Sequence, residues 1–151
     1  METSMASSEL IDKAKAVLAD TFVLYMKTHG YHWNVIGSDF PQYHKFFGNM
    51  YEELHDAIDD IAEQIRQLDS FAPGTLSRMI ELSEIKEDDK IPTADKMISN
   101  LLVANEQVLG CLKECYDLSD DEPAFNNFLQ DRMMAHKKHA WMLRAVSGIK
   151  S

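Results

Sequence analysis

Apolar residues recur every three or four positions along four long stretches of the chain, and this spacing predicts four amphipathic helices. The expected helices run over residues 7 or 8 to 34, 38 to 69, 95 to 118 and 123 to 146. Ser7 or Ser8, Asp39 and Thr93 are placed to cap three of them, and Gly148 is placed to end the last. A short helix is expected within 75–85, and the chain has no strand pattern and no internal repeat.

Four helices with a long crossover between the second and third match a ferritin-like bundle better than an up-down bundle with short loops. The fold class predicted is therefore all-α, a ferritin-like four-helix bundle with a short extra helix in the crossover. The 151 residues fit a single domain, 1–151, in which residues 1–6 are expected to be a flexible tail.

Composition narrows the range of partners. The formal net charge of −10 and the pI near 4.9 disfavour nucleic acid and anionic membranes, and favour cations. No apolar run approaches the roughly 20 residues of a membrane span, so we expect a soluble protein. Cys111 and Cys115 are four apart in a helical pattern, which suits core or half-buried thiols and a reducing, cytoplasmic location.

The second predicted helix carries a stripe of metal-ligand residue types. His44, Glu52, His55, Asp59 and Glu63 project from one face when each residue turns about 100° around the helix axis. Imidazole and carboxylate groups suit iron and similar cations. The alternative interpretation is a solvated acidic face, which is the usual explanation for a run of charge.

His44 cannot reach the two acids within one chain. Fifteen residues separate it from Asp59, which is about 22 Å along a helix, far beyond a metal–ligand bond. Either the stripe is a coincidence or another part of the assembly completes the site. An antiparallel copy of this helix, related by a two-fold axis near residues 52 to 55, would bring His44 of one chain to Asp59 and Glu63 of the other and make two identical sites.

A di-iron centre inside one chain has little support. Ferritin-like bundles of that type use a Glu-x-x-His pair on each of two helices, and here only Glu52 and His55 have this spacing. His136 and His139 have no Glu three residues before them. We therefore assign these two histidines a structural role first.

The chain resembles the Dps family, the mini-ferritins, over essentially its whole length. The resemblance rests on His32-Trp33 at the end of the first helix, His44 twelve residues after His32, and Asp59 and Glu63 in the second helix. It implies that His32, His44, Asp59 and Glu63 are both catalytic residues and metal ligands, in iron-binding ferroxidase centres shared across a two-fold interface. It further implies a hollow homododecamer that oxidises Fe(II), preferably with hydrogen peroxide rather than dioxygen, stores ferric mineral and protects against oxidative stress.

One position departs from the family pattern. Members usually carry an Asp four residues after the second histidine, and this chain has Gly48 there. Glu52 or His55 is the candidate to compensate for the missing carboxylate. On this interpretation, introducing Asp at Gly48 is expected to strengthen iron binding.

DNA binding, the other activity of the family, usually depends on a lysine-rich tail. No Lys or Arg precedes Lys13, so we expect weak or absent DNA binding at physiological salt. Two alternatives to a ferroxidase stay open: a non-catalytic helical cage, and a nucleoid-associated protein with a degenerate metal site.

Overall fold

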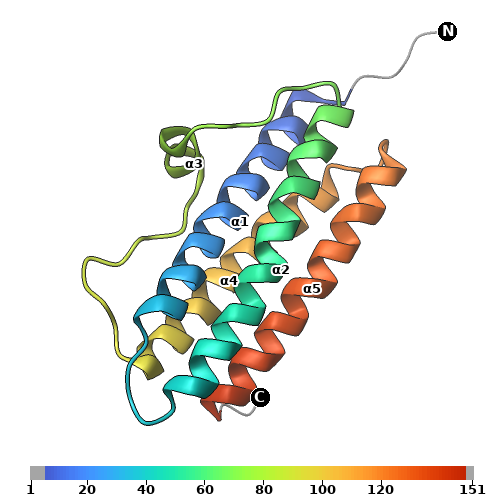
Figure 1. The fold of residues 1–151 in the computed structure, drawn as a ribbon. Coiled ribbons are helices and arrows are strands. Elements are labelled where there is room, and N and C mark those ends of the chain that lie inside the picture. The colour runs from blue at the N-terminus through green and yellow to red at the C-terminus, as the bar shows by residue number, and fades with distance from the viewer. Residues whose placement is uncertain (1–5, 149–151) are drawn as a thin grey trace, which may run out of the picture.

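Five α-helices make up the computed structural model, which describes residues 6–148 (Figure 1). They are α1 (Ser8–Asn34), α2 (Phe40–Gln67), α3 (Leu76–Leu82), α4 (Ala94–Asp117) and α5 (Pro123–Ser147). The four long helices lie side by side as a bundle, and the short α3 lies beside α1 in the crossover from α2 to α4. The ferritin-like four-helix bundle with a short extra helix is therefore confirmed.

The lengths of the connections set the helix directions. A short connection turns α1 back into α2, so these two helices are antiparallel (Figure 1). The crossover then carries the chain back along the outside of α1, so that α4 runs in the same direction as α2 and α5 runs opposite to both. This topology places the end of α1 and the start of α2 at one end of the bundle.

Local hydrogen bonds explain where several helices begin and end. The Ser7 hydroxyl accepts from the Leu10 backbone N–H at 3.1 Å, and the Thr93 hydroxyl accepts from Lys96 N–H at 3.3 Å, as their cap positions predict. Gly148 ends α5 with a φ of 76°, a conformation that suits glycine. The side-chain cap expected from Asp39 is wrong. Asp39 occupies the N-cap position of α2 but makes no side-chain bond to the helix.

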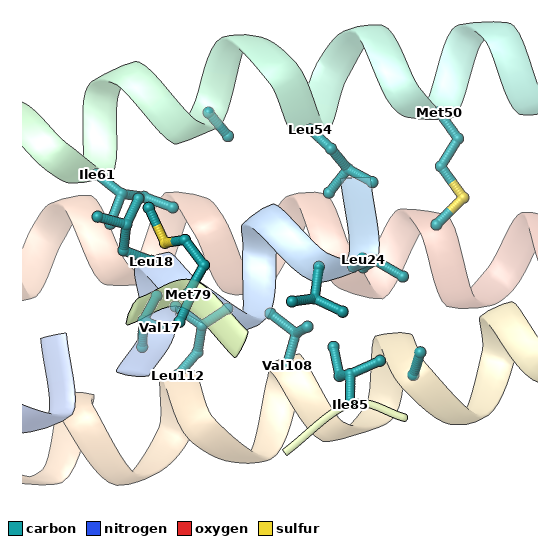
Figure 2. Close-up of a cluster of buried hydrophobic side chains, with 14 of the residues drawn as sticks. Val17, Leu18, Leu24, Met50, Leu54, Ile61, Met79, Ile85, Val108 and Leu112 are labelled. Carbon is teal, nitrogen blue, oxygen red and sulfur yellow. The ribbon is translucent and has the colours of Figure 1, made fainter. Parts of the chain in front are cut away.

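Buried aliphatic side chains from α1, α2 and α4 meet along the length of the bundle (Figure 2). Each stripe expected from the sequence points inward, and the fully buried residues include Leu18 of α1, Leu54 of α2 and Leu112 of α4. Met79 of α3 and Ile85 of the crossover join the same cluster. Burial of this continuous apolar surface is the main force that holds the bundle together.

Polar contacts fasten the crossover to the bundle. Asp20, buried on α1, accepts from the Ser83 hydroxyl at 2.8 Å and from the Glu84 backbone N–H at 3.1 Å. Further along, the Tyr31 hydroxyl donates to the Asp88 carboxylate. Tyr31 directly precedes His32 in the sequence, so its bond to the crossover helps to fix the end of α1.

Residues 1–5, most of the expected tail, lie outside the described residues, and Ala6 packs against the core. Cys111 is half-buried and Cys115 is buried, both as free thiols, as expected. Among the described helices, none is long and apolar enough to cross a membrane.

Candidate metal centre

His32 and His44 lie against each other where α1 ends and α2 begins. Their ring centroids are 3.7 Å apart and the ring planes differ by 17°, so the two imidazoles are stacked. Both side chains are half-buried. The structure therefore brings together two of the four ligands expected from the sequence.

Each of the two rings is held by the other residue's backbone. His32 Nδ1 lies 2.6 Å from the His44 carbonyl oxygen, and His44 Nδ1 lies 2.7 Å from the His32 carbonyl oxygen. A carbonyl oxygen can only accept, so each Nδ1 carries the proton and donates it. In the neutral rings Nε2 then keeps its lone pair, which is the form of imidazole that binds a metal ion.

The turn between α1 and α2 creates this pairing. The Val35 backbone N–H donates to the Tyr31 carbonyl at 3.0 Å and closes α1, and Gly37 then takes a φ of 128° that favours glycine. Pro41 lies in the first turn of α2, where its missing N–H leaves no helical bond unmade. The short turn therefore lays the last turn of α1 on the first turns of α2.

Aromatic side chains surround the histidine pair. The His29 ring stacks on that of Tyr51, with the ring centroids 3.8 Å apart and the ring planes 8° apart. The centroid of the Trp33 ring lies 4.1 Å from that of His29. The Tyr25 hydroxyl is hydrogen-bonded to His29 Nδ1 at 2.9 Å. Burial, and then the neighbouring His32, lowers the pKa of His29, which favours its neutral form. His29 is not among the ligands predicted from the sequence, although its spacing of three from His32 places both on one side of α1.

The two acids lie elsewhere on α2. This helix is continuous from Phe40 to Gln67, so Asp59 remains about 22 Å along the axis from His44, and Asp59 and Glu63 are both exposed. Among the described residues no three His, Cys, Asp or Glu side chains are grouped closely enough to hold a metal ion. A single chain therefore cannot place both the two histidines and the two acids around one metal ion.

Glu52 and His55, the candidates to compensate for Gly48, lie further along α2 beside His29. With it they line an open pocket of about 310 Å³, whose other lining residues are Tyr25, Tyr51 and Asp56. Both side chains are exposed. Their role as iron ligands stays a prediction.

His136 and His139 take part in a polar network inside the bundle. His136 Nδ1 lies 2.8 Å from the Asn105 amide oxygen, and Arg132 donates to His136 Nε2 at 3.1 Å. His139 Nε2 donates to Glu53 Oε1 at 2.7 Å. Burial lowers the pKa of His136 well below its usual value, so this ring is neutral and serves as a hydrogen-bond partner. These contacts support the structural role expected for both histidines.

Comparison with known proteins defines the class to which the fold belongs. Residues 11–149 match the family described as a ferritin-like domain. The chain is 35% identical to the DNA protection during starvation protein of Helicobacter pylori, over 87% of this chain and 93% of that protein. The crystal structure of a Dps protein from Bacillus brevis superposes with a TM-score of 0.89 at 31% identity, over 97% of this chain and 99% of the other.

The Dps protein of Vibrio cholerae O1, a member of a broad superfamily of ferritin-like diiron-carboxylate proteins, has the same fold. Its TM-score is 0.87 at 24% identity, over 96% of this chain and 98% of the other. The bundle and these matches together define a ferritin-like protein. Within that class, the chain belongs to the Dps family.

Proposed function

We propose that this protein oxidises ferrous iron at centres shared between two copies of the chain and stores the ferric product inside a hollow homododecamer. In each centre His32 and His44 come from one chain, and Asp59 and Glu63 come from a second copy. Protection against oxidative stress would follow, because ferrous iron and peroxide are removed together.

The observation that carries this proposal is the held pair of imidazoles. His32 and His44 each use Nδ1–H on a backbone carbonyl, so two Nε2 lone pairs remain beside each other for a cation. Metal-binding histidines usually have this second hydrogen bond, because it fixes the tautomer and the ring orientation. A histidine pair with only a structural role does not require the Nε2 lone pairs of both rings to remain available for a ligand.

The distant acids support a shared centre. Asp59 and Glu63 are exposed and four residues apart, so they project from neighbouring turns of α2. Two imidazoles with carboxylates form a ligand set that suits ferrous iron. Antiparallel pairing of two α2 helices joins the halves, and the two-fold symmetry then gives two equal centres per dimer.

The reaction balances without any further reagent. Two ferrous ions give up one electron each, hydrogen peroxide takes both electrons as its O–O bond breaks, and two protons complete two water molecules. The residues of this chain hold the ions in place, and the protein's charge of −10 attracts them toward its surface. The same charge disfavours DNA as a partner, so we do not extend the DNA protection named for the Helicobacter relative to this chain.

The test is ferrous oxidation, with peroxide consumption measured in parallel. Asp59→Ala or Glu63→Ala should slow the reaction by well over tenfold. Loss of a residue that only hydrogen-bonds to a metal ligand already costs roughly tenfold, and these variants lose a ligand itself. The fold should stay intact, because each residue is exposed. Circular dichroism checks the helix content.

Asp60→Ala is the matched control, because Asp60 is an exposed acid beside Asp59 on the same helix and is not in the proposed ligand set. It removes the same charge and should leave the rate unchanged. Equal rates for wild type, Asp59→Ala and Asp60→Ala would contradict the proposal, and rates equal to that of ferrous iron without protein would favour a non-catalytic cage.

A further inference from the structure

Glu52 and His55 lie on the outer side of α2, near its middle, without a polar partner. Both side chains are exposed, and within residues 6–148 neither makes a side-chain hydrogen bond or an ion pair. The His55 ring lies against Tyr25 of α1, with the ring centroids 5.2 Å apart. Residues three positions apart on a helix are neighbours on its surface, so this carboxylate and this imidazole can bind one ligand together.

The proposed pairing of two α2 helices places Glu52 and His55 at the two-fold axis. The histidine of one α2 meets the two acids of the other when the axis crosses the helix just after Glu52, midway between His44 and the acids. Measured along the helix, Glu52 then lies within about 2 Å of the axis and His55 within about 5 Å. Asp59 lies roughly 10 Å from the axis, so this position is separate from both proposed ferroxidase centres.

The charges at this axis favour a bound cation. The Glu52 carboxylates of the two chains face each other there, and like charges at short distance repel. No Lys or Arg occurs in α2 between Lys45 and Arg66, so this stretch of the helix supplies no positive side chain to offset the repulsion. A second copy also removes water from Glu52 and His55, and a polar group that is buried without a partner is costly. A cation between the chains gives each of these groups a partner.

We propose that Glu52 and His55 of two chains together bind one divalent transition-metal ion on the two-fold axis. This inference rests on the proposed function, because it uses the same pairing of α2 helices. Di-metal bundles take a Glu-x-x-His pair from each of two helices, and here the symmetry supplies the second pair that a single chain lacks. Two carboxylates and two imidazoles give the four ligands of a closed, structural zinc site, so the ion fastens the two chains to each other.

The alternative is a direct contact without metal, in which a protonated His55 of one chain donates to Glu52 of the other. Titration with Zn²⁺ by calorimetry separates the two arrangements, because the axial site binds one ion for every two chains. The proposed ferroxidase centres must be disabled first. Full-length, assembled protein that carries both His44→Ala and Asp59→Ala serves this purpose, since every centre then lacks a ligand from each chain.

We expect this double variant to bind one Zn²⁺ per two chains. Adding His55→Ala or Glu52→Ala should abolish the binding, because either change removes two of the four ligands. The matched control is Asp60→Ala, which removes an exposed acid of α2 that is outside the proposed site, and the stoichiometry should stay the same. Absence of zinc binding in the double variant would favour the direct contact and overturn the inference, and so would one Zn²⁺ per chain.

Crystals of the wild-type protein grown with Zn²⁺ give a readout that needs no variant. Anomalous scattering at the zinc absorption edge should show a peak on the two-fold axis, bonded to His55 of both chains. Peaks beside His32 and His44 with none on the axis would refute the axial site and leave the proposed function standing. A peak on the axis with none beside the two histidines would support the axial site and contradict the proposed function.

Discussion

Glu53 is a half-buried carboxylate that contacts inside the bundle keep in its ionised form. It accepts from Arg132 through both oxygens and from His139 at 2.7 Å. Burial favours the neutral acid, but the bonds from His139 and Arg132 outweigh it and lower the pKa of Glu53 to about 2. A pKa that is depressed in the folded state stabilises the protein when the group is ionised. This stabilisation is complete above about pH 4.5 and is lost as the pH falls toward about 2.

Replacing Glu53→Gln should destabilise the protein at neutral pH, because Arg132 keeps its charge and loses its counter-charge. The cost should fall below the roughly 3–5 kcal/mol of a fully buried pair, since the Glu53 side chain is 36% exposed. Denaturant unfolding at several pH values measures it, with Glu106→Gln, an exposed acid on α4, as the control. The difference in the free energy of unfolding between wild type and Glu53→Gln should become smaller as the pH falls from 4.5 to 2. A difference that does not change with pH would refute the stabilising role of the Glu53 charge.

At the scale of residues, the sequence predicted which side chains are candidate ligands better than it predicted the contacts that those side chains make. It predicted His32 and His44 as ligands, but not their reciprocal bonds, which depend on how the turn lays α1 on α2. The sequence indicated only that Gly48 lacks the usual carboxylate. No sequence pattern reveals that the His32 ring lies next to Gly48. The pairing of Glu53 with Arg132 joins residues 79 positions apart, and no local signal encodes it.

At the scale of elements, the helices follow from local physics. Periodicity and caps predicted the ends of α1, α4 and α5 to within one or two residues, because hydroxyl caps and Gly148 act over a single turn. The expected bond from Asp39 is not formed, and the short helix α3 is narrower than its predicted range. These misses lie at an irregular turn and in the crossover, where tertiary contacts outweigh local preference.

Two glycines at the helices give a paired prediction about helix geometry. Gly110 lies inside α4, where an added Cβ meets nothing within 4 Å, so Gly110→Ala should stabilise the protein by about 1 kcal/mol. Gly148 ends α5 with φ at 76°, so Gly148→Ala should destabilise it by about 1–2 kcal/mol. Thermal unfolding of both variants measures the difference. A stabilised Gly148→Ala would contradict the left-handed helix end described for Gly148, and a destabilised Gly110→Ala would contradict the open space around Gly110.

At the scale of the whole molecule, one chain holds only part of the proposed chemistry. The stacked histidines lie at one end of the bundle, and Asp59 lies about 22 Å along the same helix. The sequence could predict this separation, because a helix has a fixed rise per residue. It could not supply the partner surface, since the pairing of two copies depends on shape and burial over many residues.

Co-assembly of two inactive variants tests the shared centre most directly. Every centre in a His44→Ala oligomer, and every centre in an Asp59→Ala oligomer, lacks one proposed ligand, so each variant alone should be nearly inactive. In a mixed dimer one centre carries both lesions, while the other combines an intact His44 with an intact Asp59. Random pairing makes about half of the dimers mixed, so roughly a quarter of the wild-type ferrous oxidation rate should return.

The measurement is the initial rate of ferrous oxidation after the two variants are unfolded together and refolded. Each variant refolded alone and wild type refolded in the same way are the controls. Recovery of about a quarter of the wild-type rate is the result that centres shared between chains predict. A mixture no more active than its two parents would contradict them, because a centre built within one chain gains nothing from mixing.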